Sequence, residues 1–156
     1  MKIVRTKDVE WANATQKGKF WQRRKDLGST GALSAGMYEL PSGKKSFPFH
    51  MHHVTEEALF VVSGTGKVRT PDGMTPVGPG DWVAFPPKAG AHQLINDGAE
   101  PLVYVALGVN PSGVDIVEYP DSGKIASRTG GPPSGQRFMY KKEPQLEYFA
   151  GETDAE

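Results

Sequence analysis

Short apolar runs, each stopped by a glycine- or proline-rich turn, are the feature that most limits how this chain can fold. Between Leu33 and Val109 these runs have strand length and recur about every 8–12 residues, which is the spacing of β-sandwiches and β-barrels. No segment there repeats apolar residues with the period of a helix. Glycine and proline, at 19 and 13 of 156 residues, well exceed their combined average of about 12%. The pattern predicts an all-β fold.

The expected strands are the apolar runs themselves. They are Leu33–Leu40, Ser46–His52, Ala58–Ser63, Lys67–Thr70, Asp81–Phe85, His92–Asn96, Leu102–Val109 and Val114–Tyr119. One more short strand is expected at Lys2–Thr6, and a turn at Pro71-Asp72-Gly73. Large apolar side chains are the ones most often buried. The candidates for core or cavity wall are therefore Phe49, Leu59, Val61, Trp82, Phe85 and Leu94.

The length predicts one domain, since two would each be small for a stable core. We expect an N-terminal arm at residues 1–32, a barrel at residues 33–119 and a C-terminal extension at residues 120–156. Within the extension, residues 130–135 are expected to be a flexible link and residues 151–156 a frayed acidic end. The aromatic side chains between them are expected to form a strap on the body or on a second subunit: Phe138, Tyr140, Tyr148 and Phe149.

Composition excludes several classes of function. The 18 basic and 18 acidic residues balance, which argues against a general nucleic-acid binder, because neutralising phosphates needs a basic excess. The chain has no cysteine, which excludes disulfides, iron–sulfur clusters and thiolate metal sites. It contains neither a run of about 18 apolar residues nor an apolar leader. We therefore expect a soluble cytoplasmic protein without a membrane or nucleic-acid partner, and any metal must bind to nitrogen and oxygen.

The histidines carry the most specific chemical signal. His50 and His52 lie two residues apart, so in a strand both point to the same face, about 6.5–7 Å apart along the backbone. Two imidazoles at that spacing can bind one ion, at about 2.0–2.1 Å from each nitrogen. Glu57 could supply an oxygen after a short turn, and His92 could complete the site from a later strand. His53 must point the other way.

The spacing of these residues resembles the two sequence motifs of the cupin superfamily. The motifs here read His50-x-His52-x4-Glu57-x6-Gly64, fifteen further residues, Gly80-x5-Pro86, and then His92-x3-Asn96. The resemblance implies a double-stranded β-helix, which is a jelly-roll barrel, with one divalent metal held by His50, His52, Glu57 and His92. The six residues before Gly64 favour Glu57 over Glu56 as the ligand. Asn96 is expected to satisfy a turn.

Imidazole and carboxylate ligands accept zinc, manganese, iron or nickel, so the ligand set leaves the metal open. An open site of this kind can polarise a carbonyl or hydroxyl group, or lower the pKa of a bound water. With Fe(II) it can also activate oxygen. The sequence shows no definite general base, so catalytic residues other than the metal ligands stay unassigned.

Three functions remain open at this point. Small bacterial cupins similar to this one are grouped with sugar-phosphate isomerases, which implies an isomerase-like enzyme acting on a small polar substrate such as a sugar or sugar phosphate. The alternatives are a non-haem Fe(II) dioxygenase and a non-catalytic protein that binds a small ligand. A homodimer is expected, because exposed sheet edges need to be covered and because the resemblance to other cupins implies one.

Overall fold

The computed structural model describes residues 1–130 and 135–151 and confirms the all-β prediction. The described residues form strands and two short 3-10 helices, η1 (Thr6–Asp8) and η2 (Pro120–Ser122). The strands are β1 (Ala12–Lys17), β2 (Phe20–Thr30), β3 (Leu33–Leu40), β4 (Met51–His52), β5 (Glu56–Ser63), β6 (Gly66–Thr70), β7 (Gly73–Val77), β8 (Trp82–Phe85), β9 (Gln93–Ile95), β10 (Leu102–Val109), β11 (Val114–Tyr119), β12 (Lys124–Thr129) and β13 (Gln136–Lys141). No helix among these residues is long and apolar enough to cross a bilayer.

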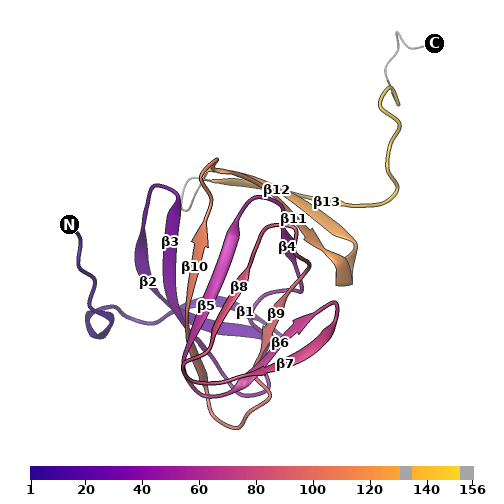
Figure 1. Ribbon diagram of the computed structural model, residues 1–156. Helices are drawn as coiled ribbons and strands as arrows, with labels where there is room; N and C mark the ends of the chain where they lie inside the picture. Colours follow the sequence, from indigo (N-terminus) through magenta and orange to yellow (C-terminus); the bar gives the residue numbers. More distant parts are fainter. Residues whose placement is uncertain (131–134, 152–156) are drawn as a thin grey trace.

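The strands form three antiparallel sheets (Figure 1). The largest has the order β1-β2-β3-β10-β5-β8, a second has the order β13-β12-β11-β4, and the third has the order β7-β6-β9. An isolated antiparallel bridge between His50 and His92 joins the second sheet to the third. Figure 1 shows β11, β12 and β13 lying across the top of the barrel, above the strands of the largest sheet. This is the jelly-roll arrangement.

The core lies between the largest sheet and the three-stranded sheet. Alternate residues of each strand point into it, as a two-residue side-chain period requires. The buried members of this cluster are Leu40, Leu59, Val61, Val68, Val77, Leu94, Leu102 and Tyr104. Burying each side chain of this size stabilises the fold by about 1.5–3 kcal/mol. This apolar layer holds the strands that carry the histidines in a fixed register.

Most of the predicted core residues are inside, but the prediction for Trp82 is wrong. Its side chain is 59% exposed, whereas Phe49, Leu59, Val61 and Leu94 are buried. Trp82 and Phe85 are three positions apart in β8 and therefore point to opposite faces. Phe85 packs against the core, so Trp82 must face outwards.

The N-terminal residues contain more sheet than the sequence predicted. Residues 2–6 form no strand, and the first element is the 3-10 turn η1. β2 instead pairs with β3 along most of its length and joins the largest sheet. Its charges are accommodated on the surface, where Arg23 forms an ion pair with Glu39 of β3 and lies over the ring of Trp11. The division at residues 32 and 119 stays a prediction.

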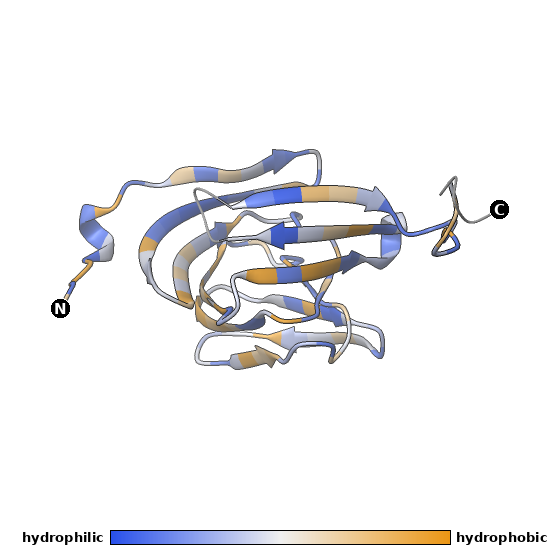
Figure 2. Cartoon of the chain, turned by 90° about the horizontal axis from the view of Figure 1, so that it is seen from above, coloured by the Kyte–Doolittle hydropathy of each residue, from blue (hydrophilic) through white to orange (hydrophobic). Residues whose placement is uncertain are grey.

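The C-terminal part pairs with the body and then leaves it. β13 pairs with β12 from Gln136 to Lys141. The described residues that follow β13 extend away from the body, on the side opposite to the N-terminal residues (Figure 2). Leu146, Tyr148 and Phe149 are 81%, 89% and 61% exposed. These side chains therefore do not pack on their own barrel, and a strap on a second subunit stays a prediction. The predicted link and the acidic end lie largely outside the described residues.

Asn96 satisfies a turn, as predicted. Its side chain is fully buried between β9 and β10. The amide nitrogen donates to the carbonyl groups of Leu40 and Glu100, at 2.8 Å each, and the amide oxygen accepts from the N–H of Gly98 at 2.9 Å. Burying an amide is favourable only when its hydrogen bonds are made, so this residue fixes the turn and touches no cavity near the histidines.

Candidate metal centre

The folded chain brings together the four residues singled out as ligands. His50 and His52 lie at β4, Glu57 at the start of β5, and His92 just before β9. The His50–His92 bridge sets the two motifs side by side. His50, His52 and His92 are 9%, 7% and 8% exposed. Glu57 points inwards between them, whereas Glu56 is exposed.

The three imidazoles surround one carboxylate. Nε2 of His50 lies 3.6 Å from Glu57 Oε2, Nε2 of His52 lies 3.4 Å from Oε1, and Nε2 of His92 lies 3.0 Å from Oε2. The donor atoms of His50, His52 and Glu57 are all within 4.8 Å of one another, and these three could hold a metal ion. His92 meets them through Glu57, with its ring centre 4.6 Å from that of His50. The assignment of all four as ligands stays a prediction.

Hydrogen bonds fix which nitrogen of two histidines faces this point. The Nδ1 atom of His50 lies 2.8 Å from the carbonyl oxygen of Pro48, and that of His52 lies 2.5 Å from Asp115 Oδ2. A carbonyl or carboxylate oxygen can only accept, so Nδ1 must carry the proton in both rings. The Nε2 lone pairs are then directed at Glu57. This is how proteins orient imidazoles that bind metals.

Asp115 is a supporting residue that the sequence analysis missed. It lies in β11, is 1% exposed and accepts from Thr55 Oγ1 at 2.6 Å as well as from His52. Its other oxygen accepts from the backbone N–H groups of His53 and Val54 at 3.2 and 2.9 Å. The sequence did hold one indication: Asp115 is an acidic residue in an apolar strand, two positions from Val117, so both side chains point to the same, inward face. That phase indicates burial, and a buried carboxylate needs partners.

His92 is held differently from the other two histidines. Its Nδ1 atom is buried and has no hydrogen-bond partner among the described residues. Its ring stacks on Phe85 with centroids 3.8 Å apart and an interplanar angle of 9°. Packing rather than a hydrogen bond at Nδ1 therefore fixes this ring.

The electrostatics favour an ionised carboxylate at Glu57. Burial raises the pKa of Glu57, but its close contacts with the three histidines outweigh it and hold the pKa well below its usual range. Burial is also the main reason that the pKa of His92 is lowered. Burial opposes protonation of His52 too, but contacts with Glu57 and Asp115 raise its pKa overall. Glu57 thus supplies one full negative charge to the centre.

His53 lies outside the centre, as the alternation predicted. Its Nε2 lies 2.8 Å from Oε1 of Glu118, and the other oxygen of Glu118 accepts from Lys142 Nζ at 2.5 Å. The side chains of adjacent residues in β4 and the turn after it point to opposite sides. His52 therefore points into the barrel, whereas His53 contacts Glu118, which also binds Lys142 after β13.

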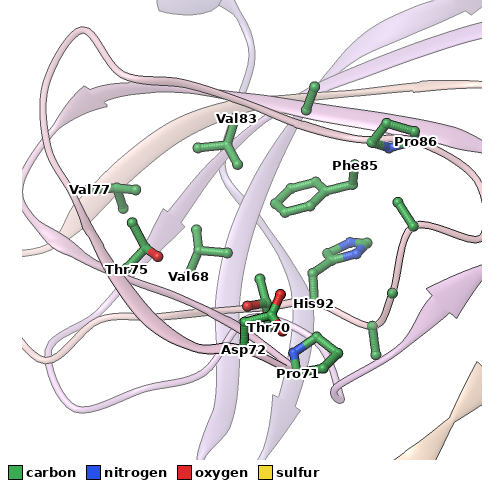
Figure 3. A pocket seen from close by; sticks show the side chains of 14 residues that line it. Val68, Thr70, Pro71, Asp72, Thr75, Val77, Val83, Phe85, Pro86 and His92 are labelled. Atoms are coloured by element: carbon green, nitrogen blue, oxygen red, sulfur yellow. The ribbon is translucent and has the colours of Figure 1, made fainter.

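Two cavities adjoin the centre. One, of about 60 Å³, is lined by His50, Glu57 and His92 together with apolar core residues. The other, of about 440 Å³, lies between the β6–β7 hairpin and β8 and reaches His92 and Phe85 (Figure 3). Thr70, Asp72 and Thr75 give it a polar side. Neither lining contains lysine or arginine.

The fold and the donor set together define a jelly-roll barrel with a candidate metal centre, and the chain belongs to the cupin superfamily. Residues 36–108 match the family described as Cupin domain. A protein of Acidithiobacillus ferrooxidans, provisionally named a sugar phosphate isomerase, has a crystal structure similar to this chain. The two are 30% identical over 81% of each chain, with a TM-score of 0.72.

Other solved structures share the fold at lower identity. A cupin-superfamily sugar phosphate isomerase from Silicibacter pomeroyi is 20% identical over 94% of this chain and 98% of its own, with a TM-score of 0.78. A Thermotoga maritima protein named as a predicted oxalate decarboxylase is 19% identical over 70% and 99%, with a TM-score of 0.63. No curated protein matches the chain.

The contacts of Asp115 predict its effect on stability. We expect Asp115→Asn to lower the free energy of unfolding by about 1–3 kcal/mol, because the amide nitrogen turns a donor towards groups that need an acceptor. The control is Asp121→Asn. Asp121 is 50% exposed and pairs with Arg69, and loss of an exposed pair costs about 0–1 kcal/mol. Urea unfolding of both variants measures the difference, and equal losses would contradict the role given to Asp115.

Proposed function

We propose that this chain is a metal-dependent enzyme that acts on a small polar substrate such as a sugar or sugar phosphate, with isomerase-like chemistry. The observation that carries the proposal is the convergence of three imidazole Nε2 atoms on the Glu57 carboxylate. The substrate class is supported by the 30% identical relative from Acidithiobacillus ferrooxidans and its provisional name.

The donor set fits a divalent transition metal. His50, His52, Glu57 and His92 would hold it, and nitrogen and oxygen ligands suit zinc, manganese, iron or nickel. The hydrogen bonds at Nδ1 of His50 and His52 leave their Nε2 atoms free to bind. A structural site of paired charges alone would not need two rings oriented in this way.

A bound divalent ion supplies Lewis-acid stabilisation of negative charge on substrate oxygens. The protein contributes the rest. Glu57 offsets one positive charge, and Asp115 keeps His52 in one orientation. The apolar walls contributed by Phe85 and the core exclude water, which strengthens electrostatic interactions at the site. The 440 Å³ cavity beside His92 is within the size range of small-molecule sites.

The metal assignment is tested by comparing two neighbouring histidines. We expect His52→Ala to weaken metal binding by more than the roughly 10–100-fold that loss of a mere supporting residue costs. His53→Ala is the matched control, because His53 contacts Glu118 instead and should leave the metal content unchanged. Elemental analysis of untagged protein measures both. Equal metal content in wild type and His52→Ala would refute the assignment.

The reaction class is tested with metal-loaded protein. We expect NMR to show interconversion of an aldose phosphate and its ketose isomer, no oxygen consumption, and loss of turnover in Glu57→Gln. Oxygen uptake with stoichiometric iron would instead show a dioxygenase. A bound sugar phosphate that stabilises the protein thermally without turnover would show a non-catalytic binder.

We further propose that two copies associate through the outer side of the largest sheet, in the cytoplasm. Phe60, Val62 and Trp82 are 41%, 43% and 59% exposed there. Phe60 lies directly opposite Trp82 on one side and Val105 on the other, so the apolar side chains form a continuous row. An exposed sheet face is normally polar. Two copies that cover this row on each other would remove its apolar side chains from water.

The dimer is tested by adding one charge to this row. We expect Trp82→Lys to shift the protein towards monomer in size-exclusion chromatography with light scattering, because a lysine would be desolvated at the contact. Met74→Lys is the control, since Met74 is 54% exposed on β7 of another sheet. A monomeric wild type, or dimers in both variants, would contradict the proposal.

A further inference from the structure

A chain of side-chain hydrogen bonds connects the turn after β10 with the candidate metal ligand His52. Nδ2 of Asn110 lies 3.0 Å from Oγ1 of Thr55, and that oxygen lies 2.6 Å from Oδ2 of Asp115. The same Oδ2 lies 2.5 Å from Nδ1 of His52. Residues separated by 55 to 63 positions in the sequence therefore meet behind one histidine ring.

The direction of each hydrogen bond in this chain is fixed. Oδ1 of Asn110 accepts from the N–H groups of Ser112 and Gly113, at 3.1 and 2.8 Å. The NH2 group of Asn110 must therefore face Thr55. An amide NH2 group only donates, so the Thr55 oxygen accepts there. Its own hydrogen is then directed to Asp115, which as a carboxylate only accepts.

Four donors hold the carboxylate of Asp115, two on each oxygen. Oδ1 accepts from the backbone N–H groups of His53 and Val54. Oδ2 accepts from Thr55 and His52. A carboxylate has about four lone-pair positions, so this group cannot turn without losing a hydrogen bond. Without the Thr55 hydroxyl, Oδ2 would be held only by His52, which is the ring that it has to orient.

The hydroxyl lies where water cannot easily replace it. Thr55 is 7% exposed and Asp115 is 1% exposed. A buried polar group that loses its partner is left unsatisfied, which costs more than the same loss at the surface. The chain is also tied to the largest sheet, because the N–H of Asn110 donates to the carbonyl group of Ala32 at 2.9 Å. The orientation of His52 thus depends on one enclosed hydroxyl group.

We propose that Thr55 is a positioning residue for the metal ligand His52 and that it acts through Asp115. Groups that orient a ligand change the affinity for the metal. The other two histidines lack such a chain, since Nδ1 of His50 faces a backbone carbonyl and Nδ1 of His92 has no partner among the described residues. The role of His52 as a ligand rests on the proposed function, whereas the contacts of Thr55 do not.

Competition between the protein and a chromophoric chelator for Zn²⁺ tests this role. Thr55→Val keeps the shape of the side chain and removes the hydroxyl. We expect it to weaken zinc binding about three- to tenfold, less than the roughly 10–100-fold that loss of a group in direct contact with a ligand costs. Thr55→Ser keeps the donor and should bind zinc as the wild type does. Thr15→Val is the control, because Thr15 is half-buried in β1.

A double variant distinguishes positioning through Asp115 from a general loss of stability. In the Asp115→Asn background, Thr55→Val should have little further effect on zinc affinity, because residues that act through one contact are not additive. Urea unfolding of each variant verifies that zinc is added to folded protein. Additive effects, unchanged affinity in Thr55→Val, or equal losses in Thr55→Val and Thr55→Ser would overturn the proposal.

The outcome for Thr55 is separable from that for the metal centre. If His52→Ala loses its metal while Thr55→Val binds zinc like the wild type, the metal assignment stands and the positioning role is refuted. A wild type that retains no divalent transition metal would overturn both. Zinc affinities in the expected order without any turnover of an aldose phosphate would support the role of Thr55 and refute only the proposed reaction.

Discussion

A single carboxylate placed among three imidazoles is the constraint to which the rest of the structure conforms. Glu57 is charged and largely enclosed, and a charge removed from water must be matched by partners in good geometry. His50, His52 and His92 provide those partners from two stretches of chain. They can do so only because the His50–His92 bridge holds the edges of two sheets together. The bridge that joins the two sheets therefore lies beside the charged Glu57.

Residues around the centre connect the three histidines to the rest of the fold. Asp115 connects His52 to the turn after β4, and β11 connects Asp115 to the hairpin of β12 and β13. On the other side, Phe85 fixes His92 and belongs to the layer that packs on Leu59 and its neighbours. His52 and His92 are thus supported by different parts of the fold, so a local distortion of one part does not displace both rings.

The sequence predicted what depends on short-range periodicity. The strands Leu33–Leu40, Leu102–Val109 and Val114–Tyr119 have the predicted bounds, because their apolar runs end at unambiguous turns. The alternation of side chains along a strand also correctly predicted that His53 points away from the centre.

The strand β2 was missed because its charged run resembles a solvated loop, although partners on the neighbouring strands accommodate the charges. β7 was missed because Pro76 argues against a strand, yet β7 is an edge strand, where the missing N–H does no harm. Asp115 pairs with His52 across 63 residues, and no local pattern contains that information.

The unequal support of the three rings has a mechanical consequence. His50 and His52 each have a hydrogen-bond partner at Nδ1, whereas Nδ1 of His92 has none among the described residues and its ring stacks on Phe85 instead. Rotating His92 therefore breaks no hydrogen bond at Nδ1, and on that side only the packing against Phe85 opposes it. The same ring borders the larger cavity. The histidine held by packing is therefore the one that a molecule entering this cavity would meet.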